Sequence, residues 1–222
     1  MLKGILKRTI NEMLNSNRCV ICSKDKGNNE NICDNCFLKF KNSVKLQNVE
    51  NIFYMSYYEE DMRKLIITYK KRGNKLIGNV IARLIRDGIK KVIEENDIDV
   101  VIPVPLNKKR ENERGFNQIT YVLDKLKIKY REIKRTKNTH YMFDLKSYEE
   151  RRKNIKNAFD IDIVLEDKTI LVVDDIITSG STMSEIEREI KRNYNIKKIY
   201  FFTFSVAKSF VTNGGKLESI HR

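Results

Sequence analysis

The chain has 222 residues, 41% of them hydrophobic, and a formal net charge of +14. This length suits one domain of ordinary size with a small addition, and the apolar content is enough for a packed core. No apolar run approaches the roughly 20 residues that span a bilayer. The first residues also lack the continuous apolar segment of a signal peptide, so we expect a cytoplasmic protein.

The positive charge has two interpretations that the sequence leaves open. A strongly basic protein is attracted to polyanions, above all nucleic acid, and to anionic membrane surfaces. However, the charge is spread along a chain rich in Lys, Asn and Ile, as an AT-rich coding sequence would give. An extended solvated surface would explain such a distribution equally well.

All four cysteines lie near the N-terminus, as Cys19-Val-Ile-Cys22 and Cys33-Asp-Asn-Cys36. Before them, apolar residues at helical spacing predict an amphipathic helix over residues 2–14, packed on the protein's own body or, alternatively, on a membrane. Two CxxC pairs ten residues apart are typical of a tetrahedral zinc site with four thiolate ligands. The alternative is disulfides or free thiols. Four thiolates leave no open position on the metal, so we expect structural zinc.

Strands alternating with helices after residue 50 predict an α/β fold with a parallel sheet flanked by helices. We expect the cysteine module over residues 1–48, the α/β body over 49–207 and a loose tail over 208–222. The expected strands are 52–57, 99–102, 130–133, 158–164, 170–173 and 199–206, and the expected helices are 59–72, 76–93, 118–126, 147–157 and 182–190. Residues 107–115 form either a solvated connector or a lid whose cations close over a polyphosphate.

The apolar run Ile170–Val173 ends in two adjacent carboxylates, Asp174 and Asp175. Ligands of open α/β sheets bind at the carboxyl ends of the strands. The turn that follows, Thr178–Thr182, offers hydroxyls and backbone N–H groups at a helix N-terminus, where anions bind. The pattern indicates a phosphorylated sugar. A plainer interpretation also stands, in which Thr182-Met-Ser-Glu185 is a helix capping box.

Val172–Thr182 resembles the phosphoribosyl pyrophosphate (PRPP) motif of type I phosphoribosyltransferases. The whole chain resembles the ComF/ComFC family of competence proteins. Its features occur here in the family's order: a four-cysteine zinc finger, Ile102-Pro-Val-Pro-Leu106, Arg114-Gly-Phe-Asn-Gln118 and the segment Glu150–Phe159. The family's own motif often has Thr-Thr-Gly where Thr178-Ser179-Gly180 stands in this chain.

The resemblance implies a type I phosphoribosyltransferase-like sheet and a site for PRPP with Mg²⁺ on its pyrophosphate and ribose oxygens. Asp174 and Asp175 would bind the ribose hydroxyls and would be the catalytic groups, and the turn would hold the 5′-phosphate. The pyrophosphate would meet the turn after Ile102. The residues implied in PRPP binding are Asp174, Asp175, Ile176, Ile177, Thr178, Ser179, Gly180, Ser181, Thr182, Pro103, Val104, Lys108, Arg110 and Arg114.

Three functions follow from these features. The first is a PRPP-binding competence protein that assists uptake of transforming single-stranded DNA, peripheral to the inner membrane beside DNA-translocation proteins. The second is an active phosphoribosyltransferase of nucleotide metabolism or salvage, whose acceptor the sequence does not identify. The third is an adaptor whose zinc finger and amphipathic helix dock partners.

Overall fold

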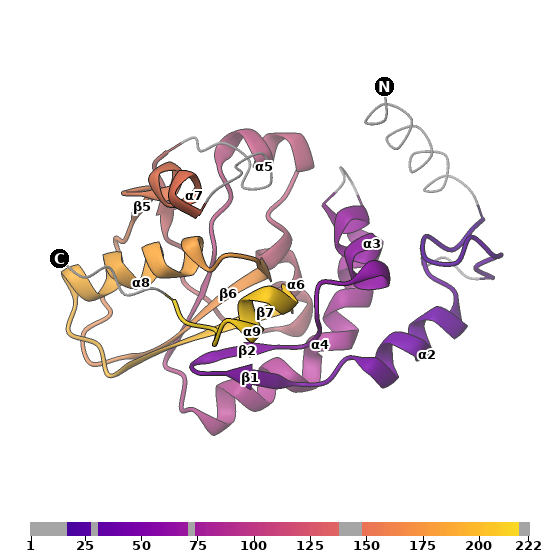
Figure 1. The fold of residues 1–222 in the computed structure, drawn as a ribbon, viewed down its shortest axis with the longest axis horizontal. Helices are drawn as coiled ribbons and strands as arrows, with labels where there is room; N and C mark the ends of the chain where they lie inside the picture. Colours follow the sequence, from indigo (N-terminus) through magenta and orange to yellow (C-terminus); the bar gives the residue numbers. More distant parts are fainter. Residues whose placement is uncertain (1–16, 28–30, 71–73, 138–147, 218–222) are drawn as a thin grey trace.

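A computed structural model describes residues 17–27, 31–70, 74–137 and 148–217. Its main sheet has five strands in the order β1-β2-β7-β6-β3 (Figure 1). The strands are β1 Gln47–Val49, β2 Ile52–Tyr54, β3 Val100–Pro103, β6 Thr169–Ile177 and β7 Lys198–Val206. β1 and β2 pair antiparallel, and all other pairs are parallel. The predicted α/β fold with a mostly parallel sheet is therefore confirmed.

Helices cover both faces of this sheet (Figure 1). Leu171 and Val173 of β6 pack in one apolar cluster with α3 and α4, whereas Ile170 and Val172 pack in a second cluster with α8. This alternation follows from the period of two along a strand buried on both faces. The helices of the first face are α2 Asp34–Ser43, α3 Glu60–Tyr69, α4 Lys75–Glu95 and α6 Gln118–Leu126; those of the second are α7 Tyr148–Ile155, α8 Ser181–Asn193 and α9 Lys208–Thr212.

The predicted connector at residues 107–115 is instead helix α5, Lys108–Arg114. Asn107 accepts the backbone N–H of Arg110 at its N-terminus, and Gly115 ends it with a φ of 83°. The capping residues Asn107 and Gly115 could be recognised in the sequence. The short helix has no buried residue, however, so no apolar stripe indicates it.

Two predicted strands are also placed differently. Residues 130–133 form no strand; the second sheet instead pairs β4, Lys134–Arg135, with β5, Phe159–Asp160. β6 runs past the expected Val173 to Ile177 because β7 pairs with it as far as Ile177↔Val206. Both aspartates therefore lie within the last part of a strand.

The segment after Lys208 departs from the expectation of a loose tail. Residues 208–212 form α9, and Phe210 is buried in the second apolar cluster. The predicted helix over residues 2–14 lies outside the described residues, as do the last residues of the predicted helix 59–72. Among the helices that the structure describes, none has the length and apolar character of a membrane span.

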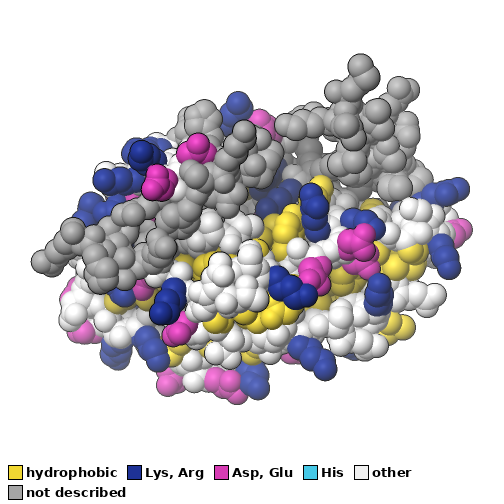
Figure 2. Space-filling view, viewed as in Figure 1, with side chains coloured by type: hydrophobic (Ala, Val, Ile, Leu, Met, Phe, Trp, Pro, Cys, Tyr) yellow, Lys and Arg dark blue, Asp and Glu magenta, His cyan; other side chains and the backbone are white. Residues whose placement is uncertain are grey.

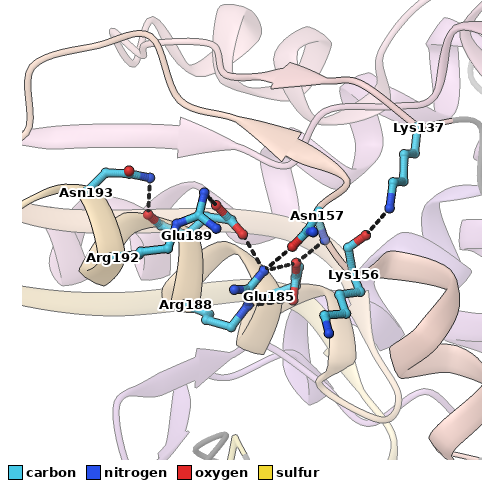
Figure 3. Close-up of polar contacts among 8 residues, drawn as sticks. All are labelled: Lys137, Lys156, Asn157, Glu185, Arg188, Glu189, Arg192 and Asn193. Atoms are coloured by element: carbon cyan, nitrogen blue, oxygen red, sulfur yellow. Dashed lines mark hydrogen bonds and ion pairs between the residues drawn. The ribbon is translucent and has the colours of Figure 1, made fainter. Parts of the chain in front are cut away.

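A buried ion network joins α8 to the chain before β5 (Figure 3). Arg188 binds Glu185 at 2.7 Å and also contacts Glu189, and both carboxylates are almost fully buried. The same guanidinium donates to Asn157 Oδ1 at 2.8 Å, while Glu185 accepts the backbone N–H of Asn157. α7 and β5 are thereby held against the helix that follows Asp174 and Asp175.

Candidate phosphosugar site and four-cysteine centre

The two carboxylates lie at the carboxyl end of β6, between β3 and β7. Asp175 is 8% exposed, and Lys70 Nζ lies 2.9 Å from its Oδ1. Lys70 is the C-cap residue of α3, more than a hundred positions earlier in the chain. Lys70 thus gives this buried carboxyl group an ion-pair partner.

Asp174 is half-buried, and its Oδ1 accepts the backbone N–H of Asp175 at 2.8 Å. Burial and the neighbouring charge of Asp175 raise the pKa of Asp174 to about 7, against the lowering effect of Lys70 and Arg135. The surrounding cations thus favour the charged form of Asp174, and the neighbouring carboxylate opposes it. Such a pair accepts well from vicinal hydroxyls of a sugar.

Arg135, from β4, is a second cation of this site that the sequence analysis did not single out. Its Nη1 donates to the carbonyl of Pro105 at 3.3 Å, and its guanidinium lies 5.4 Å from the Phe159 ring centre. Burial and the charge of Arg110 lower the pKa of Arg135 to about 10, whereas the charge of Asp174 raises it. Arg110 and Asp174 therefore both act on Arg135.

In the sequence, Lys70 begins the basic run Lys70-Lys71-Arg72 and Arg135 follows Lys134. With 44 Lys and Arg residues in the chain, no local signal distinguishes the two whose charges act on Asp174. Their role depends on contacts between distant segments.

The turn after β6 presents hydroxyls at the start of α8. Gly180 caps the helix with a φ of 72°, and the hydroxyls of Ser179 and Ser181 lie 2.9 Å apart. Thr182 is inside the helix and Glu185 binds Asn157, so the capping-box interpretation is wrong. A helix of 13 residues directs its N-terminal N–H groups at this turn, which favours an anion.

The Pro103-Val104 segment runs beside β6, because Val104 donates its N–H to the carbonyl of Val173 at 2.9 Å. Asn117 Nδ2 lies 3.5 Å from the carbonyl of Val104 and so joins the Arg114–Gln118 segment to it. Arg114 itself donates to Gln118 Oε1 at 2.7 Å. The two sequence segments that carried the resemblance are thus in contact.

The remaining residues implied in PRPP binding divide by exposure. Ile177 is buried and Ile176 packs against the first apolar cluster, so only their backbone could meet a ligand. Lys108 is exposed on α5, while Arg110 reaches the neighbourhood of Arg135. The structure gathers Asp174, Asp175, the turn, Pro103-Val104 and Arg110 at one end of the sheet, whereas the exposed Lys108 has no contact with them among the described residues.

The four cysteines form one cluster whose sulfur atoms all lie within 4.8 Å of one another. Cys22 Sγ and Cys33 Sγ are 3.7 Å apart, and all four thiols are free. A tetrahedral zinc ion with bonds of about 2.3 Å separates its sulfurs by about 3.8 Å, whereas a disulfide needs about 2.05 Å. The cluster therefore fits a metal such as zinc.

Backbone donors favour the thiolate of Cys19, whereas burial raises the pKa of Cys33 and of Cys36. Ile21 donates its N–H to Cys19 Sγ at 3.4 Å. Burial raises the pKa of Cys19, but N–H groups of Cys22, Cys33 and Ile21 outweigh it and bring the pKa down to about 7. Hydrogen bonds to sulfur orient and stabilise metal-bound thiolates.

The cysteine module, meaning residues 17–27 and 31–44, packs on the α/β body beside α3 and α4. Asn31 Nδ2 donates to Asn74 Oδ1 at 2.9 Å, and both residues are buried. Arg83 lies 4.0 Å over the Phe37 ring, and Lys39 pairs with Asp61 at 2.9 Å. Cys19 and Cys36 belong to the same apolar cluster as Leu65 and Ile66 of α3.

No protein-family model matches the chain. It is 28% identical over 156 residues to Competence protein F of Haemophilus influenzae, covering 64% of this chain and 67% of that protein. It is 26% identical to Competence protein ComFC of Streptococcus pneumoniae (80% and 76% covered) and 25% to DNA utilization protein YhgH of Escherichia coli K12 (79% and 84%). These relatives confirm the resemblance to the ComF/ComFC family over most of the chain.

Two solved structures with a similar fold are adenine phosphoribosyltransferases. One is 14% identical with a TM-score of 0.40, over 77% of this chain and 97% of that protein. The other, from Saccharomyces cerevisiae, is 15% identical with a TM-score of 0.38, over 82% and 94%.

Proposed function

We propose that this chain, a homologue of the ComF and ComFC competence proteins over most of its length, binds PRPP at the end of β6. One observation carries the proposal: Asp174 and Asp175 stand side by side among the cations Lys70 and Arg135, directly before a hydroxyl-bearing turn at a helix N-terminus. Carboxylates suit sugar hydroxyls, and the cations and turn suit phosphates.

The proposed roles follow from position. Asp174 and Asp175 accept from the ribose 2′- and 3′-hydroxyls, and Thr178–Thr182 hold the 5′-phosphate with side-chain hydroxyls and N–H groups. The backbone at Pro103-Val104 faces the pyrophosphate in this proposal, and Lys108, Arg110 and Arg114 of α5 supply cations for it. Bound Mg²⁺ would neutralise the pyrophosphate and help it to leave, while retaining several waters.

At the cysteine cluster we propose zinc in a structural role. All four positions of a tetrahedral ion are filled by Cys19, Cys22, Cys33 and Cys36, so no site is left for a substrate. The metal would hold the polar segment between the two CxxC pairs, which is too short to bury a core of its own.

Titration calorimetry with Mg·PRPP tests the site directly. Wild-type protein should bind, and the double variant Asp174→Asn plus Asp175→Asn should lose at least about 10-fold in affinity, because each amide replaces a charged acceptor. Asp160→Asn plus Asp162→Asn, which removes the same number of charges from two exposed aspartates, is the matched control and should bind as wild type. Absence of PRPP binding to wild-type protein would sink the proposal.

Pyrophosphate release separates a binding protein from an active transferase. Transfer of the pentosyl group breaks the bond between the anomeric carbon and pyrophosphate, so turnover releases one pyrophosphate per acceptor consumed. Release that depends on an added acceptor and disappears in the Asp174 and Asp175 double variant would make the chain a phosphoribosyltransferase. Binding without release across candidate acceptors favours the non-catalytic role.

The biological role we propose is assistance in the uptake of transforming single-stranded DNA, next to translocation proteins at the inner face of the membrane. The names of the relatives and the net charge of +14 support it. Figure 2 shows Lys and Arg spread over one face among acidic side chains, so on that face it is the net charge that supports the proposal. Binding of a single-stranded oligonucleotide should be measurable near 50 mM salt and should weaken steeply as salt rises; an affinity indifferent to salt would contradict this role.

A further inference from the structure

The cysteine module touches the body beside the segment that supplies Lys70 to Asp175. α3 pairs with the module at Asp61, through Lys39, and carries Lys70 at its other end. Asn74, four residues after Lys70, caps α4 by accepting the N–H of Ile77 at 3.4 Å. The module therefore makes a contact on each side of Lys70 in the sequence.

Of these contacts, the one made by Asn31 to Asn74 is nearest to Lys70 in the sequence. The backbone carbonyl of Asn31 accepts the N–H of Val20, which lies between the first two cysteines, and Asn31 stands two residues before Cys33. The position of Asn31 is thus fixed by both halves of the cysteine cluster. Its side chain then donates to Asn74 Oδ1, with only 6% of Asn31 and 5% of Asn74 exposed.

A buried amide pair of this kind is a specific connection. Water cannot replace Asn31 at Asn74 without opening the interface, and an unsatisfied buried amide is costly. Displacing Asn31 by loosening the cysteine cluster would therefore disturb the N-cap of α4. Lys70, whose Nζ lies 2.9 Å from Asp175 Oδ1, stands four positions before that cap in the sequence.

We infer that Asn31 and Asn74 are positioning residues through which metal binding at the four cysteines sets Lys70 on Asp175. Metal occupancy and PRPP binding are then coupled, although Asn31 contacts neither ligand. This inference rests on the proposed function. Because coupling between two binding sites is reciprocal, PRPP must raise the affinity for zinc by the same factor that zinc raises the affinity for PRPP.

The test measures zinc affinity of the full chain by competition with a chromophoric chelator, with and without saturating Mg·PRPP. Wild-type protein should bind zinc about 5-fold or more tightly when PRPP is present, at the low end of typical coupling. Asn31→Ala should keep its zinc but bring this factor close to 1. Asn17→Ala is the matched control: Asn17 lies in the same module, is exposed and donates to Asp25 at 2.9 Å, and its loss should leave the factor unchanged.

Lys70→Met provides a second route to the same answer, since Lys70 lies outside the module and its loss leaves the thiols intact. This variant should also lose the coupling, even if Asn31→Ala proves too unstable to hold zinc. PRPP binding to wild-type protein without any change in zinc affinity would overturn the inference alone. If Lys70→Met still bound zinc more tightly in the presence of PRPP, the inference would be overturned as well. If wild-type protein does not bind PRPP, the proposed function and this inference fail together.

Discussion

Tyr69, at the end of α3, donates its hydroxyl to the main-chain carbonyl of Gln118, 2.6 Å away at the start of α6. Tyr69 is fully buried, and its ring also lies 5.9 Å from the ring of Phe116. Gln118 in turn accepts from Arg114. One hydroxyl thus joins the helix that carries Lys70 to the segment that begins with Arg114.

Replacing Tyr69 by Phe should destabilise the protein by about 1–3 kcal/mol, because the buried carbonyl of Gln118 loses its donor while the ring stays in place. Urea unfolding followed by circular dichroism measures the change. Tyr200→Phe removes a hydroxyl from a half-buried ring packed on Phe53 and should shift the free energy of unfolding by less than about 0.5 kcal/mol. Equal effects of the two substitutions would show that the hydroxyl of Tyr69 adds nothing.

The raised pKa of Asp174 predicts a pH dependence of stability. Burial and the charge of Asp175 bring the pKa from 3.8 to about 7 in the folded protein. The folded state therefore holds this proton more tightly than the unfolded chain does, and stability is lost as the pH rises from about 4 to about 7. Asp174→Asn should abolish that loss and be more stable than wild type at pH 8, by on the order of 2–3 kcal/mol.

Thermal unfolding of both proteins between pH 4 and pH 8 tests this, with the exposed Asp160→Asn as control. In the wild-type protein, the affinity for PRPP should change with pH in the opposite direction from the free energy of unfolding. Affinity should increase as the pH rises through about 7, because only the ionised carboxylate accepts from both hydroxyls. Parallel pH profiles for wild type and Asp174→Asn would contradict the pKa assignment.

Much of the fold could be predicted because it depends on local patterns. The run Ile170–Val173 is buried on both faces, as four consecutive apolar residues before two aspartates indicate. The four cysteines cluster because the first CxxC pair spans a local turn, the second spans the N-terminus of α2, and only these two local structures have to meet. The charged residues show no comparable pattern that would predict which of them lie near the carboxylates. Lys70 contacts Asp175 because of the packing of α3, and the β4–β5 pair places Arg135 where its charge acts on Asp174. No spacing in the sequence encodes either arrangement.

Gly180 should be the least replaceable residue of the turn after β6. Its φ of 72° is strained for a residue with a side chain, and an added Cβ would lie 2.8 Å from the Phe210 ring and 2.9 Å from Leu217. Gly180→Ala should destabilise the protein by more than the roughly 1–2 kcal/mol of a left-handed residue and should weaken PRPP binding. Gly214→Ala has a similar φ of 84° but only a side-chain atom of Lys216 at 4.0 Å. Gly214→Ala therefore measures the cost of the left-handed backbone alone. An equal loss of stability in Gly180→Ala would show that contact of the new Cβ with Phe210 and Leu217 costs nothing.

Arg188 should matter more than any exposed cation of α8. Its side chain is 25% exposed, yet it binds Glu185 and Glu189, whose side chains are 2% and 3% exposed (Figure 3). Arg188→Ala leaves two buried carboxylates with fewer partners, although Arg192 still pairs with Glu189 at 2.7 Å. Removal of one partner from a buried ion pair costs about 3–5 kcal/mol, and the partial exposure of Arg188 favours the lower end.

The matched control for Arg188→Ala is Lys191→Ala on the same helix. Lys191 is 58% exposed and pairs with Glu187 at 2.7 Å, so its loss should cost less than about 1 kcal/mol. Adding Glu185→Gln to Arg188→Ala should recover part of the stability, because the uncompensated charge is removed while Gln can still accept from Asn157. Denaturant unfolding of the three variants measures both effects, and a double variant less stable than Arg188→Ala would show that the buried charge of Glu185 is not what Arg188 neutralises.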